Sequence, residues 1–537
     1  MKNSLFFLLF FPIALFAQYP TFSKADSLRG TLSPLRSCYD VLYYDLEVKV
    51  TYDQKKIEGS NTIRFRAVES FNKMQIDLVK TLEISRITFR GEPVTFNRIE
   101  NAVMVNLPSF LVANSTDEIS VFYSGQPQEA ANPPWDGGWV WKRDPKGKIW
   151  VATACEGLGA SAWWPCKDHL SDEPDSMKIS IIIPKGLTAV SNGNLRRTLQ
   201  LAGNLTRYDW HVSYPINNYN VTVNIGNYAQ INETYTNNSG THKLDYYVLA
   251  QNVEKAKNHF QQVKKMMGCF EHYFGEYPFW RDGYALVEAP FWGMEHQSAI
   301  AYGNEYKNNP FGFDFIIIHE SGHEWFGNSL SMADRCDMWV HESFTTYAEA
   351  LYVEYTRNAT KSVAYLRTQR PLIKNSEPII GPSGVSYEGW KDSDMYFKGT
   401  WMLHTLRNVV ENDKLWFETI KKFAETYRLK SVTTTDAIAF FNQNLGKNYS
   451  WLFKEYLYYA EFPVLEYKII REANKTTVEY RWLASEKEFV LPVELKYGNS
   501  KDKWEPSTTW QRKTYNTINF NPQFMRDKGL YEVKEVF

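Results

Sequence analysis

The sequence predicts a multidomain α+β protein in which a helix-rich middle lies between two β-rich parts. Apolar and polar residues alternate over much of residues 40–235, and apolar residues recur at three- and four-residue steps from about 250 to 460. Alternation then returns after Pro463. A period of two is typical of half-buried strands, and the longer period is typical of amphipathic helices. The length of 537 residues suits about three domains.

Residues 18–245 are predicted to form an N-terminal domain of mostly antiparallel β structure. In Leu46–Tyr52 and again in Val221–Ile225, apolar and polar side chains alternate. Clusters of Gly and Asn such as Asn192–Asn194 interrupt these runs and are typical of turns. Asn237–Gly240 has the composition of a hairpin tip, so we place the end of the domain just after it.

Residues 246–460 are predicted to form a second, helix-rich domain. The spacing of apolar residues in Val253–Phe274 predicts one amphipathic helix that ends near Gly275. The same spacing predicts further helices in Phe344–Tyr355 and Met402–Val410. A stretch of this length can bury a core of its own.

Residues 461–537 are predicted to form a small C-terminal β domain. Alternation returns in Val493–Tyr497 and in Ile518–Phe520, beyond a helical pattern that stops before Pro463. The chain contains no internal repeat and no low-complexity tract.

Residues 1–17 match a secretory signal peptide. The apolar run Leu5–Ala17 is too short for a bilayer, which needs about 20 residues, but it fits the apolar region of such a signal. Small residues stand near a cleavage point before Gln18. We therefore expect export to the periplasm or the extracellular space, with no stable membrane insertion once the signal is removed.

The composition excludes some functions and leaves others open. With 60 Lys+Arg against 61 Asp+Glu, the chain lacks the basic excess of a nucleic-acid-binding protein. Five cysteines are too few for a disulfide framework, and Cys155 and Cys166 are open to two interpretations, a disulfide or two buried thiols. The oligomeric state does not follow from the sequence.

The strongest chemical signal is a His-Glu-x-x-His motif formed by His319, Glu320 and His323. Residues four apart on a helix lie one above the other, so the two imidazoles point toward one place. Imidazole nitrogens suit Zn²⁺, and a catalytic zinc takes a third protein ligand and keeps one position open. Glu320 is offset around the helix, where a general base can reach a water on the metal.

The third zinc ligand is expected to be an acid from another element. Glu342 stands near the start of the next helical pattern, and two antiparallel helices would bring it onto the face of the histidines. On spacing alone it competes with Glu324, Glu349 and Asp337. Glu324 is the weakest rival, because it adjoins His323 and points away from the shared face.

Further motifs stand in a fixed order along the chain. A Thr-x-Cys sequence followed by an acid lies at Thr153–Glu156, and Trp292–His296 approximates Gly-x-Met-Glu-Asn with Trp and His in place of the first Gly and the Asn. Glu342 follows the zinc motif after 18 residues, with Trp325–Asn328 between them, and Tyr396–Gly399 is a Tyr-x-Lys-Gly sequence. In these features the chain resembles the aminopeptidase N family of gluzincin metallopeptidases.

The resemblance covers about residues 40–460 and implies the type of the first two domains. It implies an N-terminal antiparallel β domain of saddle-like shape and a thermolysin-like zinc catalytic domain. The C-terminal domain lies beyond the resemblance, and from the alternation after Pro463 we expect a small β-sandwich there.

The resemblance also implies a hydrolytic mechanism. His319, His323 and Glu342 are expected to bind one Zn²⁺ per chain. Glu320 is expected to act as general base on the zinc-bound water that attacks the scissile carbonyl, and then to protonate the leaving amine. Tyr396 is expected to stabilise the oxyanion.

Substrate binding is assigned to Glu156, Gly293, Met294 and Glu295. A free peptide N-terminus has a pKa of about 7.7–8.0 and is largely an ammonium near neutral pH. Carboxylates that pair with it would select peptides with a free N-terminus, and the backbone of Gly293 and Met294 would line the peptide. A protonated His296 would add an unfavourable positive charge beside this site.

Two other functions stay open at this point. One is a zinc endopeptidase with the same hydrolytic core, against which the Glu295 motif argues. The other is a non-hydrolytic peptide-binding protein, against which the complete set of catalytic residues argues. An epoxide hydrolase side activity, as in a related hydrolase, is not excluded, and neither the preferred N-terminal residue nor the physiological substrate can be predicted.

Overall fold

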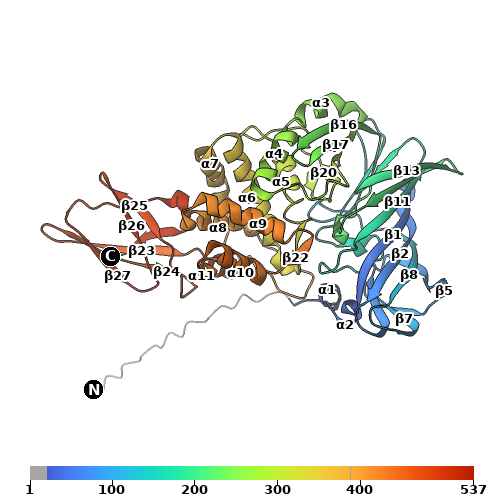
Figure 1. Cartoon of the computed structure of the whole chain (residues 1–537), viewed down its shortest axis with the longest axis horizontal. Helices are drawn as coiled ribbons and strands as arrows, with labels where there is room; N and C mark the ends of the chain where they lie inside the picture. Colours follow the sequence, from blue (N-terminus) through green and yellow to red (C-terminus); the bar gives the residue numbers. More distant parts are fainter. Residues whose placement is uncertain (1–20, 388) are drawn as a thin grey trace, which may run out of the picture.

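The computed structural model describes residues 21–387 and 389–537. Figure 1 shows three parts side by side along the long axis, with the N-terminal β structure at one end, the helices in the middle and a small β part at the other end. The predicted multidomain α+β class is therefore confirmed. The predicted signal peptide, residues 1–17, lies outside the described residues, and export stays a prediction.

The N-terminal part is built on an eight-stranded sheet in which neighbouring strands are antiparallel, except that β1 and β11 run parallel. Its strands, in sheet order, are β13 (Asn194–Leu201), β14 (Leu205–Val212), β11 (Ser176–Pro184), β1 (Tyr39–Thr51), β2 (Lys56–Ala67), β8 (Thr116–Gly125), β4 (Leu82–Phe89) and β5 (Glu92–Pro93). In β1 the apolar side chains of Leu46 and Val48 are buried, as the alternation predicts.

Two smaller sheets complete the N-terminal part. One contains β12 (Thr188–Val190), β15 (Asn224–Gly226), β10 (Ile149–Ala154) and β9 (Gly138–Arg143), and the other contains β3 (Phe71–Asp77), β7 (Ala102–Leu111) and β6 (Phe96–Ile99). The short helices α1 (Lys24–Gly30) and α2 (Pro34–Ser37) precede β1. One hydrophobic core joins the three sheets and reaches Tyr247 and Val287 of the middle part.

The middle part begins with a five-stranded sheet. Its strands, in order, are β16 (Tyr228–Asn237), β17 (Gly240–Leu249), β18 (Tyr284–Glu288), β20 (Ile300–Tyr302) and β19 (Gly293–Met294). The predicted boundary at residue 245 falls inside β17, which pairs with β16 on one side and β18 on the other. The hairpin tip at Asn237–Gly240 is therefore internal to this sheet.

Helices make up most of the rest of the middle part. They are α3 (Val253–His259), α4 (Gln262–Phe274), α5 (Phe315–Gly322), α6 (Trp339–Thr356), α7 (Ala359–Gln369), α8 (Asp394–Val410), α9 (Asp413–Thr426), α10 (Thr434–Leu445) and α11 (Ser450–Tyr458), with the short pair β21 (Leu330–Met332) and β22 (Lys430–Val432). Among the described residues, no helix combines the length and the apolar character that a membrane span requires.

The helix predicted at Val253–Phe274 is in fact two helices, α3 and α4, with a break at Phe260. The Phe260 ring is fully buried between Tyr246 and Tyr302, with ring centroids 5.1 Å away in each case. Periodicity does not reveal this break because Ala256, Phe260 and Val263 are buried at four- and three-residue steps across it. The predicted end near Gly275 is correct, and Gly275 takes a positive φ of 94° at the cap.

Helix α8 packs unusually closely on α6. A Cβ atom built on Gly399 would lie 1.8 Å from Ser343 Oγ, so only glycine fits here. Ser343 Oγ in turn donates a hydrogen bond to the Met395 carbonyl oxygen at 2.7 Å. Ser343 follows Glu342, and Met395 precedes Tyr396, so this contact sets the distance between two predicted site residues.

The C-terminal part consists of two facing sheets. One contains β27 (Gln511–Tyr515), β24 (Thr476–Leu483), β23 (Val464–Arg471) and β29 (Glu532–Glu535), and the other contains β26 (Ser500–Trp504), β25 (Val493–Tyr497) and β28 (Gln523–Phe524). Tyr480 of the first sheet stacks on Trp504 of the second, with ring centroids 4.4 Å apart. This is the expected small β-sandwich.

The sandwich is docked firmly on the helices. A single hydrophobic core runs from the middle part into the sandwich and includes Leu465 and Trp482. The buried Lys398 of α8 donates hydrogen bonds to the carbonyl oxygens of Tyr459 and Ala460 at 2.8 and 2.6 Å. The lysine of the Tyr-x-Lys-Gly sequence therefore ties α8 to the linker between the two parts.

Replacement of Gly399 by Ala is expected to destabilise the protein by up to about 2 kcal/mol. Overpacking costs about 1–3 kcal/mol, and the better helix propensity of Ala returns about 1 kcal/mol. Thermal unfolding of Gly399→Ala would be compared with that of Gly268→Ala in α4, where the nearest atom to the new Cβ is 3.6 Å away. Equal melting temperatures for the two variants would contradict the tight packing of α8 on α6.

Candidate active site

A cavity of about 370 Å³ opens between the N-terminal and middle parts. Every residue predicted to bind or to catalyse lines this one cavity: Glu156, Gly293, Met294, Glu295, His319, Glu320, His323, Glu342 and Tyr396. These residues come from a loop after β10, from β19 and the residue that follows it, from α5 and the residue that follows it, and from α6 and α8. The fold thus gathers side chains that are far apart in the sequence.

Helix α5 is fixed at its first turn by a buried cap. Asp314 accepts a hydrogen bond from the backbone N–H of Ile316 at 3.1 Å. The same carboxylate accepts hydrogen bonds from the Tyr302 hydroxyl and from Asn304 Nδ2 at 2.7 and 2.8 Å. Because α5 is only two turns long, this cap determines the direction in which the His-Glu-x-x-His residues point.

His319 and His323 converge as the four-residue spacing predicts. Helix α5 ends at Gly322, but His323 keeps helical backbone angles, and the two Nε2 atoms lie 3.2 Å apart. His319 Nδ1 donates to Glu349 at 2.8 Å, and His323 Nδ1 donates to the Phe326 carbonyl at 3.0 Å. With both Nδ1 atoms occupied, the Nε2 lone pairs are directed at a shared point.

The structure separates the four acids that spacing left as rivals. Glu342, in the first turn of α6, brings Oε2 to 3.4 Å from His319 Nε2 and 3.6 Å from His323 Nε2. Glu349 lies two turns further on the same helix and contacts the outer nitrogen of His319 instead. Glu324 accepts from Tyr277, and Asp337 accepts from Thr434, both away from the histidines.

The donor set of His319, His323 and Glu342 fits zinc. The ligand atoms lie within 4.8 Å of one another, and two imidazoles with one carboxylate are a common catalytic zinc set. Glu342 Oε2 is buried and has no hydrogen-bond partner among the residues that the structure describes. An unpaired buried carboxylate oxygen is costly, and a bound cation removes that cost.

The electrostatics of the histidines agree with a cation site. Burial lowers the pKa of His319, but the nearby carboxylates of Glu342 and Glu349 outweigh this effect and hold the pKa well above its ordinary value. The negative surroundings that favour a proton on Nε2 favour a divalent cation there equally, with the neutral imidazole as ligand. A second group, Glu295, Glu320 and His323, shares His323. Since His323 has one free nitrogen, the two groups cannot both hold an ion.

Glu320 lies beside the zinc donors and against β19. A Cβ built on Gly293 would lie 2.5 Å from Glu320 Oε1, so the strand backbone and this carboxylate are in close contact. Burial raises the pKa of Glu320 well above its ordinary value, and the carboxylates of Glu295 and Glu342 raise it further. A carboxylate with a raised pKa suits repeated uptake and release of a proton.

Tyr396 lies over the same centre. Its ring stacks on His319 with centroids 6.1 Å apart. Burial raises the pKa of the phenol well above its ordinary value, and the negative charge of Glu342 adds to this effect. The hydroxyl therefore keeps its proton and is available as a hydrogen-bond donor.

Glu295 is held by residues that the sequence did not single out. The Tyr219 hydroxyl donates to Glu295 Oε1 at 3.0 Å, and Asn328 Nδ2 donates to the Glu295 carbonyl at 2.8 Å. The neighbouring His296 is fully buried, and burial lowers its pKa to about 3. It is therefore neutral near pH 7 and does not place a positive charge beside Glu295.

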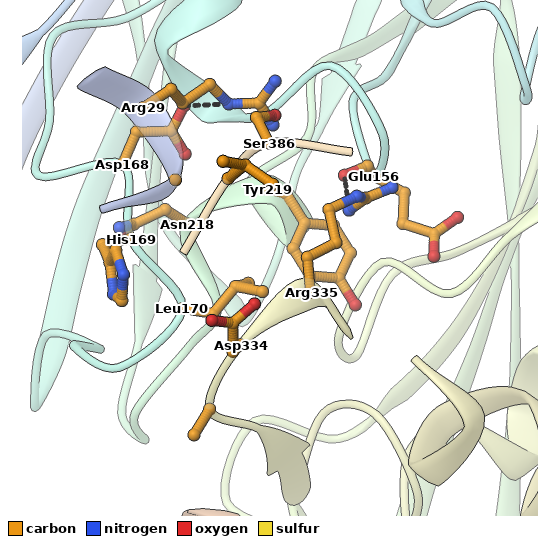
Figure 2. A pocket seen from close by; sticks show the side chains of 14 residues that line it. Arg29, Glu156, Asp168, His169, Leu170, Asn218, Tyr219, Asp334, Arg335 and Ser386 are labelled. Carbon is orange, nitrogen blue, oxygen red and sulfur yellow. Dashed lines mark hydrogen bonds and ion pairs between the residues drawn. The ribbon is translucent and has the colours of Figure 1, made fainter. Parts of the chain in front are cut away.

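Two arginines hold the loop that carries Glu156 by hydrogen bonds to its backbone. Arg335 Nη1 donates to the Glu156 carbonyl at 2.9 Å, and Arg29 Nη2 donates to the Gly157 carbonyl at 2.8 Å. Both arginines line a second, small cavity of about 50 Å³, drawn in Figure 2, in which the Glu156 side chain extends away from Arg29 and Asp168. Glu156 lines both cavities and so forms part of the wall between them.

The two cysteines near this loop are not joined. Cys155 and Cys166 are both buried free thiols. Burial raises the pKa of Cys155 to about 12, so it stays protonated and unreactive at neutral pH.

Replacement of Glu349 by Gln is expected to weaken zinc binding about 10- to 100-fold, because the partner that orients a ligating histidine loses its charge. Competition with a chromogenic chelator would measure the zinc dissociation constant without reference to turnover. Glu354→Gln is the matched control, because Glu354 lies on the same helix but pairs with Arg407 at 2.7 Å. Equal zinc affinity in both variants would contradict the orienting role of Glu349.

Two protein-family models match the chain in the order of its parts. The model described as Peptidase M1 N-terminal domain matches residues 41–219, and the model described as Peptidase family M1 domain matches residues 258–456. Together the two ranges span more than half of the chain.

Known proteins agree with these matches. Tricorn protease-interacting factor F2 of Thermoplasma acidophilum is 21% identical over 454 residues, which cover 80% of this chain and 54% of that protein. Glutamyl aminopeptidase of Rattus norvegicus is 22% identical over 433 residues, which cover 74% of this chain and 44% of that protein. The chain therefore spans about half the length of the curated relatives it matches.

A solved structure shares the fold. The M1 zinc metallopeptidase from Deinococcus radiodurans superposes with a TM-score of 0.68 at 21% identity, covering 79% of this chain and 94% of that one. The two family models, the shared fold and a donor set that fits zinc all agree, and we conclude that this chain belongs to peptidase family M1.

Proposed function

We propose that this protein is a zinc aminopeptidase that removes the first residue from peptides with a free N-terminus. The observation that carries the proposal is that Glu295 and Glu156 line the same cavity as the zinc donors and Glu320. A carboxylate in this position can pair with the terminal ammonium of a peptide while the first peptide bond lies beside Glu320.

The charge of the cavity favours such a substrate. Glu295 is only 3% exposed, and Glu320 and Glu342 are buried beside it. A carboxylate removed from water is stabilised by a cation that pairs with it. The α-ammonium group of the peptide N-terminus supplies one positive charge. This group occurs once in each peptide, on its first residue.

The residues around the peptide bond have complementary roles in hydrolysis. Bound zinc would polarise the scissile carbonyl and the attacking water. Glu320 accepts a proton from that water and returns it to the nitrogen of the leaving peptide. The Tyr396 hydroxyl donates a hydrogen bond to the carbonyl oxygen as negative charge develops on it.

Glu320→Gln is expected to keep zinc and to lose about 10²–10⁴-fold in kcat, which is the usual contribution of a general base. The amide has nearly the same size but cannot take up the proton. Metal content and kcat for an alanyl reporter amide would be measured on the same preparation. A kcat within a few fold of the unmodified enzyme would exclude Glu320 as the base.

Glu295→Ala is expected to lose about 10²-fold or more in kcat/KM on reporter amides with a free N-terminus, because the ammonium loses its buried partner. The unmodified enzyme is expected to cleave the N-acetylated reporters poorly. Zinc content of the variant provides the control, since Glu295 is not in the first donor set. Equal cleavage of free and N-acetylated reporters would instead favour an endopeptidase.

A further inference from the structure

Two large aromatic side chains stand exposed at the rim of the substrate cavity. Trp292 is 42% exposed and Trp135 is 60% exposed, and both line the cavity. Their ring centroids are 6.0 Å apart, although one residue belongs to the middle part and the other to the N-terminal part.

Both side chains are presented in a fixed way. Trp292 Nε1 donates to Asn304 Oδ1 at 3.0 Å, and the Trp292 ring meets Phe315 edge-on with centroids 4.9 Å apart. Trp135 lies at the tip of a loop that the Asp136 N–H closes by donating to the Asn132 carbonyl at 3.0 Å. The two rings thus form a preformed apolar surface that needs little ordering when it binds a ligand.

The order of residues along β19 tells which part of a substrate reaches this surface. β19 is the edge strand of its sheet. Trp292 directly precedes this strand, Gly293 is its first residue, and Glu295 directly follows it. Glu295 marks the proposed amine end, and Gly293 lies against Glu320. Trp292 is therefore one step beyond the scissile bond, on the side of the leaving peptide.

The distance between Glu295 and Trp292 gives the position in the substrate. Trp292 stands in the bend before β19 and Glu295 directly after it, so these two residues, three positions apart, are separated by at most about 10 Å. A peptide that extends alongside covers this distance within about three residues, so its second or third side chain comes to lie at Trp292.

We propose that Trp135 and Trp292 form a subsite for an aromatic side chain at the second or third position of the peptide substrate. The inference rests on the proposed aminopeptidase function and specifies its substrate class. An aromatic side chain would leave water and pack against two indole rings, an arrangement that aromatic groups favour beyond simple burial.

Three isomeric peptides test this proposal: Ala-Phe-Gly-Gly, Ala-Gly-Phe-Gly and Ala-Gly-Gly-Phe. Release of alanine by the zinc-loaded enzyme would give kcat/KM for each. One of the first two is expected to exceed the third about 10-fold, which corresponds to 1.4 kcal/mol. In Trp292→Ala and in Trp135→Ala this ratio is expected to fall to near one.

Trp510→Ala is the matched control. Trp510 is 45% exposed on the C-terminal sandwich and packs against Arg481, so its loss should leave the ratio unchanged. Trp292→Ala and Trp135→Ala change separate parts of the fold, so the test still stands if one of the two variants misfolds. A ratio near one in the unmodified enzyme, or a preference that survives both substitutions, would overturn the subsite.

A binding measurement separates failure of the subsite from failure of the enzyme. Calorimetric titration of zinc-loaded Glu320→Gln with the same three peptides ranks their affinities without turnover. If the unmodified enzyme releases no alanine from any peptide, the aminopeptidase proposal fails, and equal affinities for the isomers would then reject the subsite as well. Alanine release with no discrimination rejects the subsite alone.

Discussion

The active site depends on the burial of like charges around two histidines. The buried carboxylates belong to Glu295, Glu320, Glu342 and Glu349. Removing a carboxylate from water costs free energy, and each ionised carboxylate raises the free energy needed to ionise its neighbours. Bound cations offset this desolvation cost. One is the zinc ion that His319, His323 and Glu342 would bind, and the other is the ammonium group of the proposed substrate near Glu295. Burial raises the pKa of Glu320, and the neighbouring carboxylates of Glu295 and Glu342 raise it further.

The scaffold keeps these charges apart by precise helix packing. Glu342 and Glu349 are seven residues apart on α6, so they lie on one face and meet opposite sides of His319. The close contact of Gly399 with Ser343 holds α8 against that helix and brings Tyr396 over the imidazole. A bulkier residue at position 399 would act on the chemistry through the distance between two helices.

Local sequence patterns were sufficient to predict the order of the β-rich and helical parts and the two histidines. They were insufficient for features that depend on how separate elements pack against one another. The two histidines could be predicted because helical spacing alone aligns them. Glu342 could not be separated from Glu349 by spacing, because the choice depends on how α6 lies against α5. Tyr219 carried no signal, since its partner Glu295 is distant in the sequence. The boundary at residue 245 divides β17 because alternation looks the same in strands of neighbouring sheets.

Glu156 stands on a loop that follows a strand of the N-terminal part, whose core is distinct from the core around the zinc donors. The bond-breaking residues and this substrate carboxylate therefore belong to two bodies that meet at the cavity. Arg335 crosses that junction to reach the Glu156 carbonyl. Under the proposed function, selectivity for N-termini is partly a property of an interface, and changes in the N-terminal β structure can alter it while the hydrolytic residues stay in place.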